Sequence, residues 1–434
     1  MSVSAFPGAP KDLMLGLSTP AAAVVALSRR RGADSFAFES SGFHSAPFQK
    51  ALLATAERLS VLGLILVELA RSGRLDELKS VSGLDAARHL RLSRRQAATW
   101  DLERDSVLRR LSRAEVPTLL LKGAALRLTA YRDSAEREFA DIDVLVPKES
   151  LDAAVAALAE GGYEPESEHQ VKLYLEHHHH LILKKPQGFV VEVHWALDPA
   201  TSPFELDVAA FQRDARMITT SGGTPAVVPS PEHIVLHLAH QNLENGFCHL
   251  RRLVDVDRVI SSAADFDWAR LASESKRMRV QTVVALTLRL AELLLGTTVP
   301  VGFIEALGLS AAVRTHLALL DPVRLVLEQR GHRRAVEELL LLWCLPDLKT
   351  RLKTLKEMGT GERTQWWLAL GPGLTRDNGR TRLAALTKLV AYQALLYPTR
   401  LPGLWAGASR RSRFWDRDGQ ATERPGGCEA PSSG

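Results

Sequence analysis

Residues 122–146 read KGAALRLTAYRDSAEREFADIDVLV and carry two acidic side chains, Asp141 and Asp143, at the start of an apolar strand. Side chains alternate between the two faces of a strand, so both carboxylates project from one face, about 7 Å apart. Two carboxylates at this spacing repel each other, and a cation relieves the repulsion. Mg²⁺ suits such oxygen ligands and often shares its coordination with a substrate phosphate. The alternative is a pair of surface acids at an exposed strand edge.

A third acid lies in the later strand VVEVHW, where Glu192 and His194 are two positions apart and face the same way. If the two strands are adjacent, three carboxylates can hold two metal ions, one on each side of a transferred phosphoryl or nucleotidyl group. Glu192 taken alone is also compatible with a surface acid on an edge strand. For His194 we favour a hydrogen bond to the ligands over a role as general base.

A phosphate site is predicted just before the aspartates. The apolar strand TLLLK ends at Lys122, and Gly123 opens a helix whose first N–H groups can face an anion. Glycine lets the backbone come close to a phosphate, and Lys122 offers it a point charge. Arg137, in the loop before the aspartates, either reaches a phosphate or pairs in solvent with Glu136 or Glu138.

The order of elements predicts an α+β fold with a small mixed sheet. The strand ending at Lys122 is followed by a helix, the strand DIDVLV, the amphipathic helix KESLDAAVAALAEGGY, and a hairpin of HHLILKK and FVVEVHW joined by PQG. This pattern resembles the core of the polymerase-β-like nucleotidyltransferase superfamily. Within it, LLLKGAAL…DIDVLV together with HHLIL…VEVHW resembles a poorly characterised bacterial nucleotidyltransferase family. The resemblance covers Pro117–Pro199 and extends more loosely through LHLAHQ…LRRLVDVDRVI.

The resemblance implies a set of site residues. Asp141 and Asp143 would bind Mg²⁺, and Glu192 would complete a second metal site and help to deprotonate the acceptor hydroxyl. It implies two Mg²⁺ ions, for which Mn²⁺ can substitute, and an NTP substrate, with ATP favoured. The usual Gly-Ser pair of the superfamily is replaced here by Lys122-Gly123, so Lys122 is the candidate for the phosphate contact that serine normally makes.

Other histidines and one later aspartate have more than one interpretation. The run HHHH spans residues 177–180, and alternation along a strand lets at most two of the four share a metal ion. We therefore expect a partly exposed strand start, with His180 and also His178 near the active site, rather than a zinc site. His240 and Asp255 match the histidine and aspartate of the family-like later helices. We interpret them as a buried hydrogen-bonded pair linking two helices; the alternative places them on the acceptor side of the cleft.

Helical periodicity on both sides of the core divides the chain into five predicted regions. These are an irregular leader (1–46), an N-terminal helical region (47–116), the nucleotidyltransferase core (117–229), a C-terminal helical domain (230–405) and a disordered tail (406–434). The C-terminal helices begin at Ser230, a capping residue that is followed by Pro231 and Glu232 in the first turn. We expect the active site in the cleft between the core and these helices.

Composition restricts the class of protein. The chain has 434 residues, of which 46% are hydrophobic, and a net charge of +5, which permits an anionic partner without requiring one. Its three cysteines show no metal-binding or disulfide spacing, and no apolar run approaches the roughly 20 residues of a transmembrane helix. We therefore expect a soluble cytoplasmic protein, and the sequence leaves its oligomeric state open.

The sequence thus predicts an Mg²⁺-dependent enzyme that moves a nucleoside monophosphate from an NTP to an acceptor hydroxyl or phosphate, releasing pyrophosphate. The acceptor is unknown. One alternative is a degenerate nucleotidyltransferase fold that binds a nucleotide or a partner without turnover. The other is an RNA-binding or RNA-modifying protein, suggested by the isoelectric point of about 9.1; nucleic acid is the less favoured partner because no aromatic binding motif accompanies the basic residues.

Overall fold

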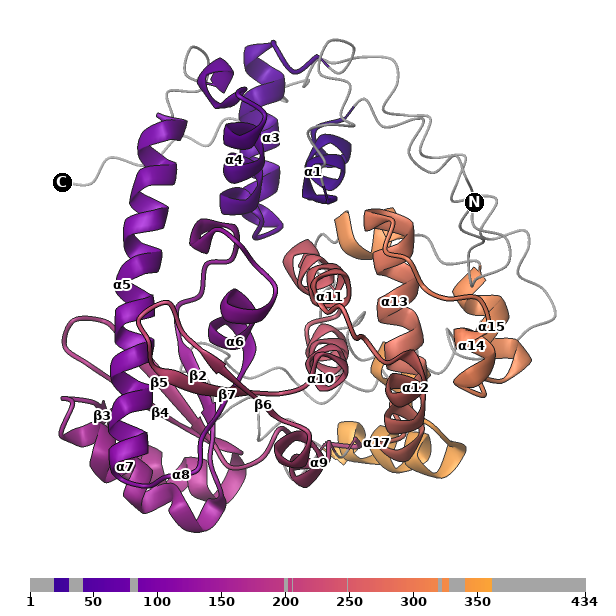
Figure 1. Cartoon of the computed structure of the whole chain (residues 1–434). Coiled ribbons are helices and arrows are strands. Elements are labelled where there is room, and N and C mark those ends of the chain that lie inside the picture. The colour runs from indigo at the N-terminus through magenta and orange to yellow at the C-terminus, as the bar shows by residue number, and fades with distance from the viewer. Residues whose placement is uncertain are drawn as a thin grey trace, which may run out of the picture. The chain divides into compact units, whose positions relative to one another are not determined.

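The computed structural model describes residues 19–30, 42–78, 85–198, 202–204, 206–247, 249–318, 322–327 and 340–360 (Figure 1). They form a mixed α+β fold with a small sheet and helices before and after it, which confirms the predicted fold class. Among the helices of these residues, none is long and apolar enough to cross a membrane. The predicted tail over residues 406–434 lies outside the described residues.

The N-terminal helical region ends in the long helix α5, whose first turn is capped by the Asp85 side chain. The Asp85 carboxylate accepts a hydrogen bond from the backbone N–H of Arg88, which satisfies one donor that a helix start otherwise leaves free. The helices of this region are α3 (Ala46–Arg58), α4 (Leu62–Arg71), the short 3₁₀ turn η1 (Leu75–Leu78) and α5 (Ala86–Arg113).

The predicted irregular leader contains a helix, α1 (Pro20–Ser28), so that prediction is wrong for these residues. The Thr19 hydroxyl caps α1, and Pro20 occupies its first turn. The helix packs on α3 and α4, and Arg258 of a later helix donates a hydrogen bond to the Ser28 carbonyl over 3.0 Å. Tertiary packing therefore stabilises an alanine-rich stretch whose composition indicated an unstructured leader.

The central sheet has the strand order β1-β2-β5-β4-β3. β2 and β5 are parallel while the other neighbours are antiparallel, so the sheet is mixed, and β4 and β5 form the predicted hairpin. Its strands are β1 (Leu119–Leu120), β2 (Ile142–Leu145), β3 (Glu164–Pro165), β4 (His180–Lys184) and β5 (Val190–His194). The connecting helices are α6 (Lys122–Thr129), α7 (Leu151–Ala159) and α8 (Glu168–His177), with the 3₁₀ turns η2 (Ser134–Glu136) and η3 (Lys148–Ser150).

Alternation along the strands separates an apolar face of the sheet from a polar one. On one face, Ile142, Val144, Val191 and Val193 join a buried cluster with residues of α5 and α7. The intervening residues project to the other face because successive side chains of a strand point in opposite directions. The acids and histidines of β2, β4 and β5 thus share the face that the apolar core does not use.

A second, two-stranded sheet follows the core and was not predicted. It consists of β6 (Arg216–Thr219) and β7 (Pro225–Val228), which are antiparallel, and β7 lies against β1. The short helix α9 (Val208–Arg213) precedes it. Gly222 in the connecting turn has no room for a side chain, because a Cβ atom there would lie 2.4 Å from a carboxylate oxygen of Asp105 in α5. The turn is therefore packed directly against α5.

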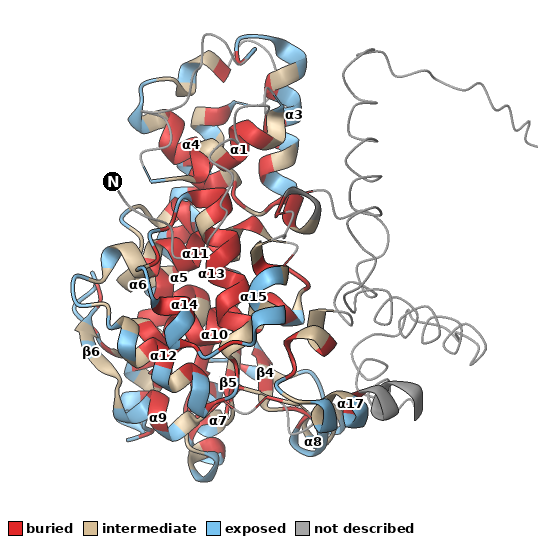
Figure 2. Ribbon diagram, turned by 90° about the vertical axis from the view of Figure 1, so that its right-hand side faces the viewer, coloured by how far each residue is buried: buried red, intermediate tan, exposed pale blue. Residues whose placement is uncertain are grey.

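The C-terminal helices start where the sequence predicts, since the Ser230 side chain caps α10 and Pro231 is its first residue. Buried residues gather on α10, α11 and α13, as Figure 2 shows, so these helices form the centre of this region. The elements are α10 (Pro231–Glu244), α11 (Leu250–Ser262), α12 (Trp268–Arg277), α13 (Gln281–Leu295), α14 (Phe303–Ala306), α15 (Ala311–Ala318), the π-helical turn η4 (Val323–Leu327) and α17 (Leu348–Thr360).

Candidate active site

The sheet register places two of the predicted acids side by side. Asp143 of β2 is the direct partner of Glu192 in the parallel neighbour β5. The Asp143 side chain is only 1% exposed and that of Glu192 17%, so both carboxylates are largely removed from water. Adjacent buried carboxylates need positive charge nearby to remain ionised.

Lys122 supplies that charge. Its Nζ lies 2.5 Å from Oδ1 of Asp143 and 3.2 Å from Oε2 of Glu192. The Leu121 N–H donates a hydrogen bond to the Asp143 carbonyl over 2.9 Å, which brings the start of α6 beside β2. Lys122 is the first residue of α6 and not the end of a strand, and its φ of +44° lies in the left-handed region that favours glycine. A non-glycine residue in this conformation is strained, so the surrounding contacts must hold it there.

His194 lies beside the same two carboxylates. Its Nε2 is 3.0 Å from Oδ1 of Asp143 and 3.3 Å from Oε2 of Glu192, and the ring is buried. The other oxygen of Asp143, Oδ2, is buried and has no hydrogen-bond partner among the described residues. A buried carboxylate oxygen without a partner is costly unless something else binds it, so this atom is suited to coordinate a cation.

Asp141 precedes β2 by one residue and is electrostatically linked to the other acids. Burial, together with the charges of Asp143 and Glu192, raises the pKa of Asp141 to about 6. Burial also acts to raise the pKa of Glu192, but the hydrogen bond with His194 and the charge of Lys122 outweigh it and hold that pKa well below its usual range. The cluster therefore holds three carboxylates against one ammonium group, which leaves it with an affinity for further positive charge.

A metal ion fits this group of residues. Asp143, Glu192 and His194 each offer one ligand atom, and these three atoms all lie within 4.8 Å of one another. Oxygen ligands from carboxylates are those that Mg²⁺ and Mn²⁺ prefer. Asp143 and Glu192 are the residues that would hold such an ion, and Asp141 is close enough to contribute its charge.

Gly123 is required for packing. A Cβ atom at this position would lie 2.7 Å from the Cβ of Phe139, closer than real Cβ contacts come. The glycine thus lets α6 approach the loop before β2, which in turn holds Lys122 near Asp143. Its predicted contact with a phosphate through the backbone stays a prediction.

Arg137 has a different partner from those expected. Its Nε donates to both carboxylate oxygens of Asp255 in α11, over 2.8 and 3.1 Å, and its guanidinium also donates to the Glu138 carbonyl. The Tyr131 hydroxyl donates to the same aspartate over 2.6 Å. The expected ion pair with Glu136 or Glu138 is thus replaced by one with Asp255, through which Arg137 links the core to the C-terminal helices. Its predicted contact with a phosphate stays a prediction.

His240 and Asp255 do not bond to each other, so their interpretation as a hydrogen-bonded pair is wrong. Asp255 is occupied by Arg137 and Tyr131, whereas the His240 Nδ1 lies 3.0 Å from Oδ1 of Asp198, after β5. His240 and Asp255 are both buried, and each ties a C-terminal helix to the core through a different partner. The linking role was expected, but a sequence pattern does not specify which residues meet.

Three further histidines lie near the site. His180 is the direct partner of His194 across β4 and β5. His179 also approaches this face, although strict alternation would turn it away. His237 of α10 is fully buried near Lys122 and His194, and burial followed by the charge of Lys122 lowers its pKa well below the usual range. Neither His179 nor His237 was singled out from the sequence.

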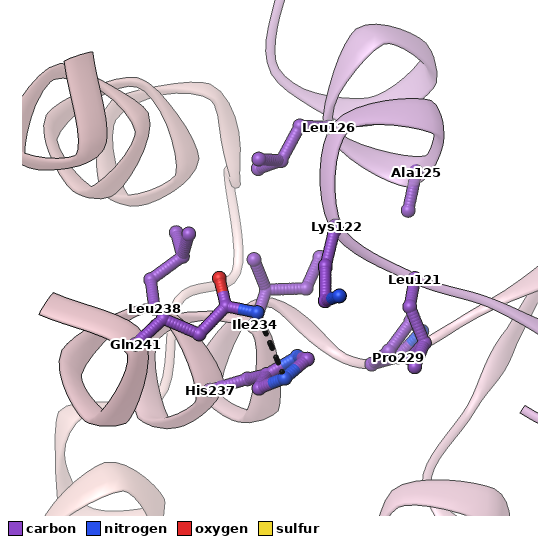
Figure 3. Close-up of a pocket in the computed structure, with 9 residues that line it drawn as sticks. All are labelled: Leu121, Lys122, Ala125, Leu126, Pro229, Ile234, His237, Leu238 and Gln241. Atoms are coloured by element: carbon purple, nitrogen blue, oxygen red, sulfur yellow. Dashed lines mark hydrogen bonds between the residues drawn. The ribbon is translucent and has the colours of Figure 1, made fainter. Parts of the chain in front are cut away.

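The space between α6 and α10 is narrow. Figure 3 shows Lys122 at the start of α6 facing His237 and Gln241 of α10. The Nε2 atoms of His237 and Gln241 are 3.2 Å apart. The cavity that these helices enclose has a volume of about 10 Å³, enough for one water molecule. A nucleotide therefore cannot occupy this particular space.

Comparison with known proteins identifies the family of the chain. The model of a family described as "Uncharacterised nucleotidyltransferase" matches residues 47–296. The chain belongs to this family. The matched range is more than half of the chain and includes Lys122, Asp143 and Glu192, so the resemblance found in the sequence is confirmed. No curated protein matches the chain.

Two solved structures are similar to parts of the chain, at low identity. The first is the solution structure of the antibiotic-resistance factor ANT(2'')-Ia, which is 13% identical, with 41% of this chain and 92% of that one covered and a TM-score of 0.29. The second is the crystal structure of an antigenic nucleotidyltransferase-like protein from Paracoccidioides brasiliensis. It is 16% identical, the match covers 47% of this chain and 95% of that one, and the TM-score is 0.30.

Proposed function

We propose that this member of the family transfers a nucleoside monophosphate from an NTP, with ATP favoured, to an acceptor hydroxyl or phosphate, with release of pyrophosphate. The observation that supports the proposal best is the pairing of Asp143 with Glu192 across parallel strands, together with the unpartnered oxygen of Asp143. Asp141, Asp143 and Glu192 would hold two Mg²⁺ ions, for which Mn²⁺ can substitute. Such ions neutralise the charge of a triphosphate and stabilise the transferred group.

The chain's own residues would position the reactants. Lys122, which contacts the carboxylates of Asp143 and Glu192, would take over the triphosphate contact that the superfamily's serine makes. His194 keeps the carboxylates of Asp143 and Glu192 oriented through its Nε2. His180, at the start of β4 next to His194, would line the acceptor side. Catalysis by such a site depends on positioning and charge neutralisation more than on covalent chemistry.

The test compares Asp143→Asn with wild type in nucleotide binding and pyrophosphate release. Binding of each of the four NTPs is measured by calorimetry with Mg²⁺ or Mn²⁺, and pyrophosphate release is then followed with a panel of hydroxyl and phosphate acceptors. The matched control is Asp152→Asn, an exposed acid of α7 on the same domain. We expect the Asp143 variant to lose metal-dependent binding and release by at least about 100-fold, with the control unchanged. Equal binding and release by wild type and the Asp143 variant would refute the proposal.

A fold that binds a nucleotide without turnover is the second candidate, and the replacement of the superfamily's Gly-Ser pair by Lys122-Gly123 favours it. The same experiment separates the two. Binding of an NTP that depends on Asp143 but yields no pyrophosphate with any acceptor supports the non-catalytic alternative. Release of pyrophosphate above the level of the Asp143 variant supports the enzyme.

A further inference from the structure

Three imidazole rings converge beside the carboxylates, from His179, His180 and His194. The ring centroids of His179 and His180 are 4.8 Å apart, and those of His180 and His194 also 4.8 Å. The ring of His179 is 5.4 Å from that of His194. One ring nitrogen from each of the three lies within 4.8 Å of the other two, so the group has the size of a metal site.

The backbone explains how neighbours in the sequence reach one site. β4 begins at His180, and His179 lies in a bend before the strand, where alternation does not apply. The bend is fixed because the N–H of Trp195 donates to the His179 carbonyl over 3.0 Å. His180 is held opposite His194 by the pairing of β4 with β5. Rigid strands therefore present all three rings to the same face of the sheet.

Burial affects the rings of His179 and His180 in the same way. Burial, with the nearby His194 adding to it, lowers the pKa of His179 to about 2 and that of His180 to about 3. Burial thus disfavours the charged imidazolium, and a metal ion binds the neutral ring. Nδ1 of each ring is buried without a hydrogen-bond partner among the described residues. A buried ring nitrogen without a partner has lost its hydration, and a metal ion would compensate for that loss.

His194 shows the arrangement typical of a metal-ligating histidine. Its Nε2 contacts the carboxylates of Asp143 and Glu192 at 3.0 and 3.3 Å. These acceptors favour the tautomer with the proton on Nε2, which leaves the lone pair on Nδ1. A ligand histidine that donates its other N–H to a carboxylate is fixed in orientation and is a stronger base towards the metal.

We propose that His179, His180 and His194 bind a divalent ion of the late first transition row, such as Zn²⁺ or Co²⁺, at a site of nitrogen ligands separate from the oxygen site for Mg²⁺. Imidazole ligands favour such ions over Mg²⁺. Three nitrogen ligands occupy three corners of a tetrahedron and leave the fourth open. Zn–N bonds of about 2.0–2.1 Å would bring the three nitrogens to roughly 3.4 Å from one another. The net negative charge of the neighbouring acids attracts the ion. This site goes beyond the proposed function, because it does not require that a nucleotide bind or react.

The experiment uses the full-length protein, purified without a polyhistidine tag and freed of metal by a chelator. Co²⁺ is the probe, because its visible absorption distinguishes tetrahedral coordination from that of the ion in buffer. We expect one equivalent to give tetrahedral bands, displaced by Zn²⁺ but not by a hundredfold excess of Mg²⁺. His180→Ala should weaken Co²⁺ binding at least 100-fold, while His177→Ala, an exposed ring of the same histidine run, should leave it unchanged.

A second measurement needs no variant, so it decides the matter even if the substitution prevents folding. Zn²⁺ should protect His179 and His180 from acylation by diethylpyrocarbonate, mapped by mass spectrometry, while the exposed His169 and His177 stay reactive. A cobalt spectrum like that of the ion in buffer, or no protection of His179 and His180, would overturn the proposal. Neither result depends on NTP turnover, so failure here is distinct from failure of the proposed function.

Discussion

Replacing Lys122 by methionine tests whether its ammonium group holds the place of a divalent cation. Methionine keeps the length of the side chain but removes the charge that lies 2.5 Å from Asp143 and 3.2 Å from Glu192. Removing one partner of a buried ion pair typically costs about 3–5 kcal/mol; because Lys122 is 26% exposed, we expect about 2–3 kcal/mol in metal-free buffer. For a chain of this size the melting temperature should then fall by about 5 °C.

Divalent cations should reverse much of this loss. In the wild type an ion must displace the ammonium of Lys122 from Asp143, whereas in the variant it meets the carboxylates without a competitor. We expect Mg²⁺ or Mn²⁺ to bind the variant about tenfold more tightly, which corresponds to about 1.4 kcal/mol. Ligands that bind only the folded state raise its stability, so the increase in melting temperature with metal should be larger for the variant than for the wild type.

The assay is thermal unfolding in chelator and in a series of Mg²⁺ concentrations, followed by circular dichroism. Lys148→Met, at an exposed position in η3, is the control for loss of a surface lysine. Lys122→Gly isolates the backbone contribution: relative to methionine it should recover about 1 kcal/mol, because glycine adopts the φ of +44° without strain. If the methionine variant is as stable as wild type in chelator and gains no more from metal, the assignment of Lys122 to the cation site is wrong.

Three other substitutions test the environment of the site. Asp255→Asn should lower the free energy of unfolding in urea by about 3 kcal/mol, because Arg137 stays buried with a weaker partner. The double variant Arg137→Met with Asp255→Leu should be less destabilised than Asp255→Asn alone, because it leaves no buried charge unpaired. In chelator, Asp141→Asn should be more stable than wild type at pH 7.5 and equal to it near pH 4. The reason is that the folded-state pKa of about 6 lies above the unfolded value near 3.9, so wild-type stability falls as pH rises between them. Gly123→Ala should cost about 1–3 kcal/mol through overpacking against Phe139, seen as a lower melting temperature.

The parts of the site that were predicted follow from local rules. Alternation along a strand indicated that Glu192 and His194 share a face, and the structure agrees because both contact Asp143. Capping chemistry located the start of α10 at Ser230. The same signal, Thr19 followed by Pro20, is present at α1, so this helix of the leader follows from the same local rule.

The parts that were missed depend on contacts between distant segments. Arg137 meets Asp255, 118 residues further along, and no local pattern specifies such a partner. His179 departs from the rule of alternation because it lies in a bend outside the strand. The contact of Lys122 with Asp143 was not predicted, while its predicted contact with a phosphate stays a prediction. In each case a charge or a backbone bend selects a partner that sequence spacing does not reveal.

Several local features of this cluster disfavour stability, and all of them concern the binding of positive charge. Asp143 keeps a buried oxygen without a partner among the described residues, and Asp141 has a raised pKa because it is buried beside other acids. Lys122 has a left-handed backbone at the position from which its ammonium reaches both Asp143 and Glu192. A protein selected only for stability would replace such groups, since a volume-matched apolar core is usually at least as stable as buried charge. Their convergence on one face of one sheet is best explained by a function that requires cations there, because local conflicts of this kind are expected at functional sites.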